Sequence, residues 1–386
     1  MRDGMPAVRV VALLFAIAIF GSLAFSQSVR AQDKPAASVS AANAVAPAKP
    51  KPPLDIAVPA APPEKINDTD FTKFSAGDLY LLSRTAAREK HYPVAAIAQY
   101  WYVRKANEGR YDLACFLSRA GQADAAFYWL QIAAVEEGLD IREVEHDSDL
   151  ETLYKDARWP KMVGYIKECR TYFETAPITR TVLIVPKGYD KTKPITAIVW
   201  LHGYLSGPDD FVNAEAQRYA DDLGVALIGV SATKSRGPRS FSWAVDVATD
   251  LKRIRAGLAE VSDRVTVEKG KLIALGFSQG GQLAIEVAVR HPEEFAGAIA
   301  FSAGSRSQLA GVTPPEALKK RGFVLCVNGK ENPGTVALTK SDADWLSAAG
   351  SKLIHKVYPD VAEHTFPADF DARFGEWVKF VLDAGK

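Results

Sequence analysis

Hydrophobic and polar positions follow two different patterns along this chain. In residues 65–170, Ala, Leu, Tyr and Trp recur at helical spacing and prolines are few, which predicts packed helices. From residue 175 to 386, short apolar runs alternate with longer amphipathic stretches. Apolar strands that alternate with helices indicate a mostly parallel sheet covered on both faces. We therefore expect an all-α module followed by an α/β unit with a doubly wound sheet.

The amino-terminal residues 1–31 have the pattern of a secretory signal peptide. Arg2 and Arg9 precede the apolar stretch VVALLFAIAIFGSLAF, and Val29 and Ala31 are small residues at the positions of a cleavage site. We expect cleavage after Ala31 and an exported protein, periplasmic or secreted, with no stable membrane insertion afterwards. The alternative is an uncleaved anchor, for which the apolar run is short.

Residues 32–64 are rich in Ala, Pro, Lys and Ser, with PAKPKPPL near the centre. Such a composition cannot bury a core, and its prolines keep the backbone extended. The sequence predicts a disordered linker between the signal peptide and the folded protein.

The helical module, residues 65–170, contains a weak internal repeat. PVAAIAQYWY and ADAAFYWL each follow an earlier helix across a short turn. The second of these stretches resembles the last unit of a tetratricopeptide array, and such modules bind proteins in that family. A protein partner is therefore expected at this module, unless its aromatic residues only pack between helices. Those residues are Trp101, Tyr102, Tyr128 and Trp129.

Composition narrows the function classes. The 386 residues carry a formal net charge of +1 and are 48% hydrophobic, which is ordinary for a globular protein and argues against a nucleic-acid partner. No phosphate-binding loop or metal-ligand cluster is evident, so neither cofactor nor metal is expected. The three cysteines are an odd number. Cys115 and Cys326 are expected to be small buried hydrophobes, and the pairing of Cys169 stays open.

The strongest motif lies in residues 271–281, KLIALGFSQGG. An apolar strand runs into Gly-Phe-Ser-Gln-Gly, a G-x-S-x-G sequence, and a helical pattern follows it. A nucleophile on such a tight turn needs small neighbours, which explains the glycines on either side of Ser278. The helix that begins at Gln279 would direct its positive end at an oxyanion beside this serine. The alternative is a glycine-rich turn with an inert serine.

Three motifs in order resemble those of the α/β-hydrolases. They are the sequence WLHGY at residues 200–204, the serine motif at residues 276–281, and EHTFP at residues 363–367. Residues 178–384 are most similar to the phospholipase/carboxylesterase group, with dienelactone hydrolases and polyester depolymerases close by. The resemblance implies a serine hydrolase for small-molecule carboxylic esters or thioesters, working through an acyl-enzyme without a cofactor.

A serine nucleophile needs a general base, and His364 is our candidate because it follows the last strand in a loop before the final helix. His202 is expected to support its own loop. The oxyanion should be held by the amides of Gln279 and of Tyr204, which lies in the loop after an early strand. Trp243 resembles an aromatic position near the family's substrate pocket, and packing under the following helix is an equal alternative.

The acidic member of the triad departs from the family pattern. Relatives carry an aspartate where this chain has Asn332, and Glu331 is its neighbour. An asparagine orients an imidazole but does not offset its positive charge. Three alternatives remain: Glu331 takes the role, Asp342 or Asp344 reaches the histidine, or the enzyme is weak. We favour Glu331.

Two other functions remain open at this level. A binding protein with a degenerate hydrolase site would explain the missing aspartate. A serine peptidase related to the prolyl oligopeptidases would share G-x-S-x-G-G, but the short catalytic domain and the lack of propeller-like repeats argue against it.

Overall fold

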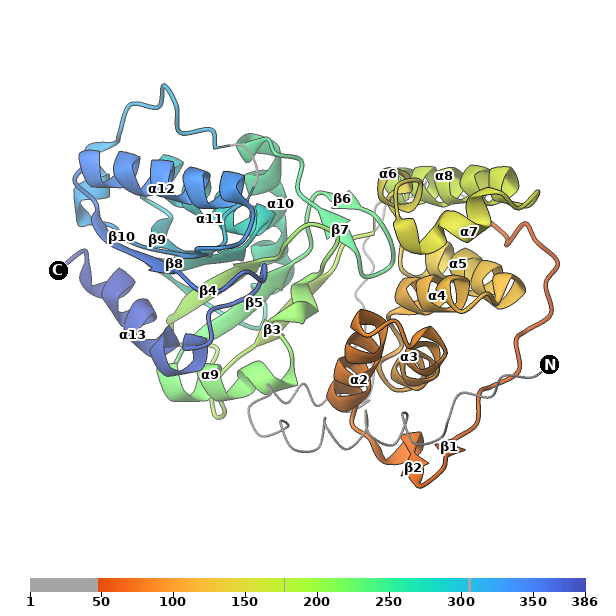
Figure 1. The fold of residues 1–386 in the computed structure, drawn as a ribbon. Helices are drawn as coiled ribbons and strands as arrows, with labels where there is room; N and C mark the ends of the chain where they lie inside the picture. Colours follow the sequence, from red (N-terminus) through yellow and green to blue (C-terminus); the bar gives the residue numbers. More distant parts are fainter. Residues whose placement is uncertain (1–47, 177, 305–306) are drawn as a thin grey trace, which may run out of the picture. The chain divides into compact units, whose positions relative to one another are not determined.

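The computed structural model describes residues 48–176, 178–304 and 307–386 (Figure 1). The predicted signal peptide and the first part of the predicted linker lie outside the described residues. The chain divides into two compact units, Met1–Ala176 and Pro177–Lys386. Among the described residues, no helix is both long and apolar enough to cross a membrane.

The first unit is helical, as the sequence predicts. Its helices are α2 (Ala76–Arg88), α3 (Tyr92–Ala106), α4 (Arg110–Arg119), α5 (Ala123–Glu136), α6 (Ile141–Val144), α7 (Glu151–Tyr154) and α8 (Trp159–Thr175), after a short antiparallel pair β1 (Lys65–Ile66) and β2 (Thr69–Asp70). Helix α2 packs on α3, α3 on α4, α4 on α5, and α5 on α8. Buried alanines such as Ala98 and Ala126 allow this close approach. The tetratricopeptide resemblance stays a prediction.

A seven-stranded sheet forms the centre of the second unit. In spatial order it contains β11 (Lys352–Tyr358), β10 (Gly322–Asn328), β9 (Phe295–Phe301), β8 (Val267–Phe277), β4 (Ile195–Leu201), β5 (Ala226–Val230) and β3 (Thr181–Ile184). All neighbours are parallel except β3 and β5. A mostly parallel α/β sheet was predicted, and the structure confirms it.

Helices cover both faces of this sheet. On one face lie α10 (Val247–Glu260), α11 (Gln279–Arg290) and α12 (Pro333–Ala348), and on the other lie α9 (Gln217–Leu223) and α13 (Phe370–Asp383) (Figure 1). Each face of the sheet has its own hydrophobic core, and alternate residues of β4 belong to different cores. Val199 packs in the core beneath α10, α11 and α12, and Trp200 packs in the core beneath α9 and α13. Burial on both faces explains why these strands read as continuous apolar runs.

Two helices of this unit begin after a cap or a short turn. Helix α10 begins at Val247, because Asp246 caps it by accepting a hydrogen bond from the Thr249 amide. Helix α9 begins at Gln217, after two short 3₁₀ turns.

All three cysteines are buried and free. The prediction for Cys115 and Cys326 is therefore confirmed, and Cys169 resembles them. Burial raises the pKa of the Cys169 thiol to about 11 and that of the Cys326 thiol to about 12.

Candidate active site

Ser278 stands on a strained turn at the carboxyl end of β8. Its backbone angles are φ 54° and ψ −121°, between the last residue of β8 and the first of α11. A side-chain-bearing residue in this region costs about 1–3 kcal/mol, and such strain persists only where neighbours enforce it. Here the Ser278 amide donates to the Phe301 carbonyl at 2.9 Å, and the Gly304 amide donates to the Ser278 carbonyl at 3.1 Å. The adjacent strand β9 therefore holds the turn in place.

The glycines beside the serine are required by close backbone contacts. A Cβ atom on Gly280 would lie 2.0 Å from the Leu201 carbonyl oxygen, and one on Gly276 would lie 2.2 Å from the Gly280 oxygen. Real Cβ atoms do not approach backbone so closely. The contact of Gly280 arises because α11 packs directly against β4. It agrees with the prediction that the residues on either side of Ser278 must be small.

His364 is bound to the carboxylate of Glu331. Its Nδ1 lies 2.5 Å from Glu331 Oε2. The Glu331 side chain is 1% exposed, whereas that of His364 is 43% exposed. The other carboxylate oxygen, Oε1, accepts a hydrogen bond from the Asn328 amide at 3.0 Å. The acid is therefore buried and fixed, and the imidazole reaches the surface.

The other candidates for the acid lie elsewhere. Asn332 caps α12, where its side chain accepts a hydrogen bond from the Gly334 amide at 2.8 Å. Asp342 is buried and accepts hydrogen bonds from Gln282 and Ser307, and burial raises the pKa of its carboxyl. The exposed Asp344 pairs with Lys340. Of the four candidates, the structure brings only Glu331 into contact with His364.

A residue that the sequence analysis missed holds the His364 loop. The Asn328 side chain donates to the Glu363 carbonyl at 2.8 Å and to the Thr365 carbonyl at 3.0 Å, so it grips the chain on both sides of His364. Asn328 is 1% exposed and ends β10. The available signal was a polar residue at the end of a buried, otherwise apolar strand.

Phe277 connects the histidine with the serine turn. Its ring centroid lies 4.8 Å from that of His364 and 5.1 Å from that of Phe366. Because Phe277 immediately precedes Ser278, the imidazole packs against the residue next to the candidate nucleophile.

His202 supports the loop after β4. Its Nε2 accepts a hydrogen bond from the Ala232 amide at 3.0 Å, so its Nδ1 carries the proton and donates to the Gly203 carbonyl at 2.7 Å. The ring is fully buried, and desolvation lowers its pKa to about 4. A neutral imidazole with both nitrogens engaged is a structural element of this loop.

Trp243 lies beneath the same loop. It is 2% exposed, and its indole N–H donates to the His202 carbonyl at 2.9 Å. The Gln279 side chain accepts from the Trp243 amide at 2.9 Å and donates to its carbonyl at 3.4 Å. The geometry therefore supports packing rather than substrate contact for Trp243. It links the residue after Ser278 to the loop that carries Tyr204.

The two expected oxyanion donors lie on these linked segments. Gln279 is the first residue of α11, where amides have no partner within the helix. Tyr204 lies in a turn whose next residue, Leu205, has φ 59° and donates its amide to the Phe241 carbonyl at 2.9 Å. Phe241 belongs to the short hairpin of β6 (Lys234–Ser235) and β7 (Phe241–Ser242). The roles of both amides remain proposals.

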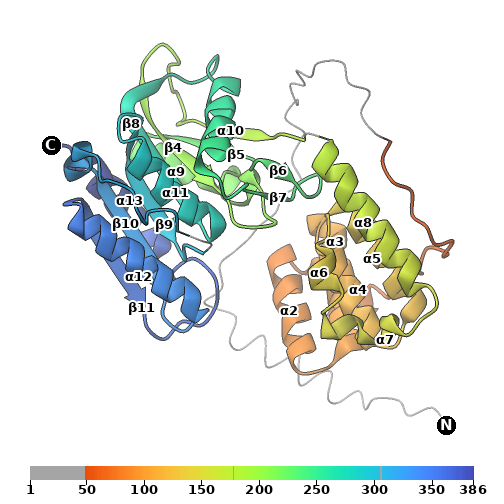
Figure 2. The same cartoon turned by 90° about the horizontal axis from the view of Figure 1, so that it is seen from above.

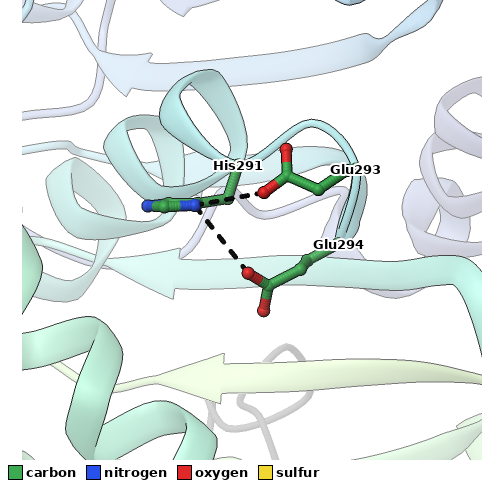
Figure 3. Close-up of side chains that lie close together, drawn as sticks. All are labelled: His291, Glu293 and Glu294. Carbon is green, nitrogen blue, oxygen red and sulfur yellow. Dashed lines mark hydrogen bonds and ion pairs between the residues drawn. The ribbon is translucent and has the colours of Figure 1, made fainter.

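One group of three potential metal ligands occurs in the described residues (Figure 3). His291, Glu293 and Glu294 place one ligand atom each within 4.8 Å of one another. However, the two carboxylate oxygens of Glu294 both accept from the Arg255 guanidinium, which also lowers the pKa of that carboxyl. Because Arg255 already neutralises this carboxylate, the group is better described as an ion-pair cluster.

Comparison with known proteins agrees with this geometry. Residues 175–356 match the family described as "Putative esterase". "Putative esterase NocK" of Nocardia uniformis subsp. tsuyamanensis is 32% identical over 117 residues, which are 30% of this chain and 33% of that protein. "Feruloyl esterase C" of Emericella nidulans is 28% identical over 134 residues, 35% of this chain and 50% of that protein. The chain thus spans half or less of the length of these relatives.

Solved structures with low identity also resemble the chain. The Bacillus cereus carboxylesterase is 14% identical, covers 55% of this chain and 99% of its own, and has a TM-score of 0.42. Esterase PE8 is 18% identical, covers 53% of this chain and 99% of its own, and has a TM-score of 0.43. Residues 175–356 are thus similar to this esterase family, and the mostly parallel sheet of the second unit has the order of an α/β-hydrolase fold.

Proposed function

We propose that the α/β unit hydrolyses carboxylic esters or thioesters through an acyl-enzyme on Ser278, with His364 as the general base and Glu331 as its acid. The observation that carries this proposal is the contact of 2.5 Å between the buried Glu331 carboxylate and His364 Nδ1. A general base oriented by a third group, beside a strained serine, is the arrangement of an activated nucleophile.

The tautomer of His364 follows from this contact. Since Nδ1 faces a carboxylate, the proton of the neutral ring lies on Nδ1 and the lone pair on Nε2. Nε2 then takes the Ser278 hydroxyl proton as Oγ attacks the acyl carbon. The Glu331 charge stabilises the imidazolium that forms, which an asparagine at the same place would not do.

The amides of Gln279 and Tyr204 hold the oxyanion of the tetrahedral intermediate. The intermediate collapses when His364 returns its proton to the leaving alcohol or thiol, which leaves the acyl group on Ser278 Oγ. Water repeats the sequence: it loses a proton to His364 and attacks the acyl carbon. The bond between the acyl carbon and Ser278 Oγ then breaks, His364 returns the proton to Oγ, and the carboxylic acid leaves. Trp243 is hydrogen-bonded both to the Gln279 side chain and to the His202 carbonyl. This link supports a fixed distance between the two donor amides.

The main alternative was a binding protein with a degenerate site, and its motivation was Asn332 in place of an aspartate. The buried Glu331 removes that motivation, because a carboxylate one residue earlier contacts the histidine. No observation in the described residues favours a peptidase over an esterase.

The test is hydrolysis of p-nitrophenyl esters from acetate to decanoate, together with methyl ferulate because some relatives are named as feruloyl esterases. The protein from Gln32 onward is compared with Ser278→Ala, and labelling by a fluorophosphonate probe is measured in parallel. Serine-dependent turnover and labelling are expected. A folded protein that neither turns over an ester nor takes up the probe would sink the proposal.

We also propose export, which rests on residues 1–31 alone. Expression in a bacterial host should yield a periplasmic or secreted protein whose first residue is Gln32. An intact amino terminus in the membrane fraction would support the uncleaved anchor instead.

A further inference from the structure

Residues 48–64 are rich in proline and precede the helices of the first unit. They contain bends but form no helix or strand. In Figure 1 this segment, drawn in red-orange, passes along the outside of the helices toward β1, and Figure 2 shows part of it from above. The sequence predicts a disordered linker here. Its described part instead makes hydrogen bonds to α3 and α5.

Burial along the segment has a period of three. Pro50 is buried, and the residues three, six, nine and twelve positions later are partly buried: Pro53, Ile56, Pro59 and Pro62. Apart from Leu54, the residues between them are exposed, and Val58 is 73% exposed. A polyproline II helix has three residues per turn, so one face of such a helix would give this pattern. The chain bends at Pro53 and Leu54, and on both sides of this bend every third residue faces the helical unit.

Gln131 of α5 binds the backbone at the middle of the segment. Its Nε2 donates to the Leu54 carbonyl at 3.3 Å, and its Oε1 accepts from the Leu54 amide at 3.3 Å. Gln131 is 3% exposed, so its position is set by the core of the unit. A side-chain amide that pairs with both backbone groups of one residue recognises the backbone there, whichever side chain that residue carries.

Two further contacts hold the ends. Lys49 Nζ lies 2.7 Å from Glu136 Oε1 at the end of α5. The Trp101 indole N–H of α3 donates to the Pro63 carbonyl at 3.4 Å. The contacts run in order along the segment from α5 to α3, so they define a direction as well as a position.

Aromatic side chains of the same two helices form a half-buried row. Tyr100 packs edge-on against Trp101 with ring centroids 5.4 Å apart and against Trp129 at 6.1 Å, and Tyr128 packs on Trp129 at 5.4 Å. All four are partly exposed rather than core residues. Aromatic surfaces with an indole donor are the usual partners of polyproline II segments.

We propose that the face of α3 and α5 carrying Trp101 and Gln131, here called the α3–α5 face, is a docking surface for polyproline II segments. Its resident ligand is residues 49–63 of this same chain. The prolines hold the segment extended before it docks, so little conformational entropy is lost on binding. This proposal does not depend on the proposed esterase activity.

A second proline-rich segment with the same period would compete with the resident one. For a short tether the effective concentration of the resident segment is on the order of 1 mM. If a free peptide has a dissociation constant about a tenth of that, the tethered segment weakens its apparent affinity by roughly tenfold.

The experiment uses a fluorescein-labelled peptide with the sequence of residues 48–64 and fluorescence anisotropy. It is titrated with the wild-type protein and with a triple variant in which Pro53, Pro59 and Pro62 are each changed to Gly. Glycine removes the preference for the extended helix, so the resident segment should leave the α3–α5 face. We expect the triple variant to bind the peptide about tenfold more tightly than the wild type.

Variants of the face test where the peptide binds. In the triple background, Gln131→Leu and Trp101→Phe should each weaken binding at least several-fold, with folding checked by circular dichroism. Replacing the buried Gln131 changes the core as well as the docking surface. The exposed ion pair between Lys49 and Glu136 therefore provides a second test that leaves the core intact. Glu136→Lys should weaken binding of the peptide by about two- to fivefold, and a peptide with Lys49→Glu should restore it.

A peptide of the same composition with its prolines moved off the period of three is the specificity control. The proposal is overturned if the triple variant binds no more tightly than the wild type. It is overturned equally if the rearranged peptide binds as well as the natural one, or if the face variants have no effect.

Discussion

Glu331 Oε2 lies 2.5 Å from His364 Nδ1, although the two residues are 33 positions apart in the sequence. They meet because β10 and β11 are adjacent and parallel, so the loops after both strands emerge at the same edge of the sheet. Asn328 then binds both of these loops. This contact supplies the carboxylate that the family pattern places one residue later.

Replacing this carboxylate should be far more harmful than replacing its neighbour. We expect Glu331→Gln to lower kcat by about 10³–10⁴, as loss of the charge does in serine proteases. Asn332→Ala should leave kcat within a few-fold and lower stability by about 1 kcal/mol, because Asn332 caps α12. Steady-state kinetics and urea unfolding of both variants test this. Equal kcat in the two variants would place the acid elsewhere.

Asn328 is expected to be a positioning residue for the general base. Asn328→Asp keeps the shape but replaces two N–H donors with an oxygen facing the Glu363 and Thr365 carbonyls. A displaced loop of about 1 Å costs on the order of 100-fold in rate. We expect kcat to fall by about that factor with KM little changed.

Thermal unfolding separates positioning from simple loss of folding in this variant. Because the Asn328 side chain binds the chain on both sides of His364, kcat should fall even at temperatures at which the variant is fully folded. An unchanged kcat together with reduced thermal stability would mean that Asn328 is only structural.

Ser278→Gly should stabilise the fold while it abolishes activity. The serine has φ 54°, a conformation that glycine adopts without strain. Relief of that strain is worth about 1–2 kcal/mol in the free energy of unfolding. Ser278→Ala is the matched control, since it removes the hydroxyl but keeps the strain. Equal melting temperatures for the two variants would show that the turn is not strained.

Gly280→Ala should prevent the native turn from forming. The new Cβ would lie 2.0 Å from the Leu201 carbonyl oxygen and 2.4 Å from the His202 carbonyl oxygen, and these backbone atoms cannot move aside as a flexible side chain would. We expect a loss above about 3 kcal/mol or no folded protein. Gly375→Ala in α13 is the control, because its Cβ would meet only the end of the Leu223 side chain, at 3.1 Å. Thermal unfolding of the two variants distinguishes them.

His202 should make stability depend on pH in a defined window. Its pKa is lowered from 6.5 to about 4 in the folded protein. Between these values the unfolded chain binds a proton that the folded chain does not, so stability falls as pH decreases from 6.5 toward 4. The full loss is on the order of 3 kcal/mol.

The measurement is the difference between the wild type and His202→Gln in urea unfolding from pH 4.5 to 7.5. Other groups titrate in both proteins, so only the difference reports His202. We expect the wild type to lose stability more steeply toward low pH. Parallel curves would contradict the buried neutral imidazole.

Local sequence determined the Ser278 turn and the layers of the α/β unit. The period of apolar residues specifies which segments are strands and helices, and Gly-Phe-Ser-Gln-Gly between them requires a tight turn because larger residues would collide with backbone. Both are properties of neighbours in the chain.

Tertiary structure decided which side chains meet. Four candidates for the acid were open in the sequence, and only the direction in which each side chain leaves its loop brings Glu331 to His364 while Asn332 turns back to cap α12. For Trp243 the sequence left a place near the substrate pocket and packing equally open, and the structure buries it under the loop after β4. The proline-rich segment likewise has no core of its own, so its order depends on a face that α3 and α5 build together. Contacts between residues far apart in the chain depend on how strands and helices are stacked, which no local pattern contains.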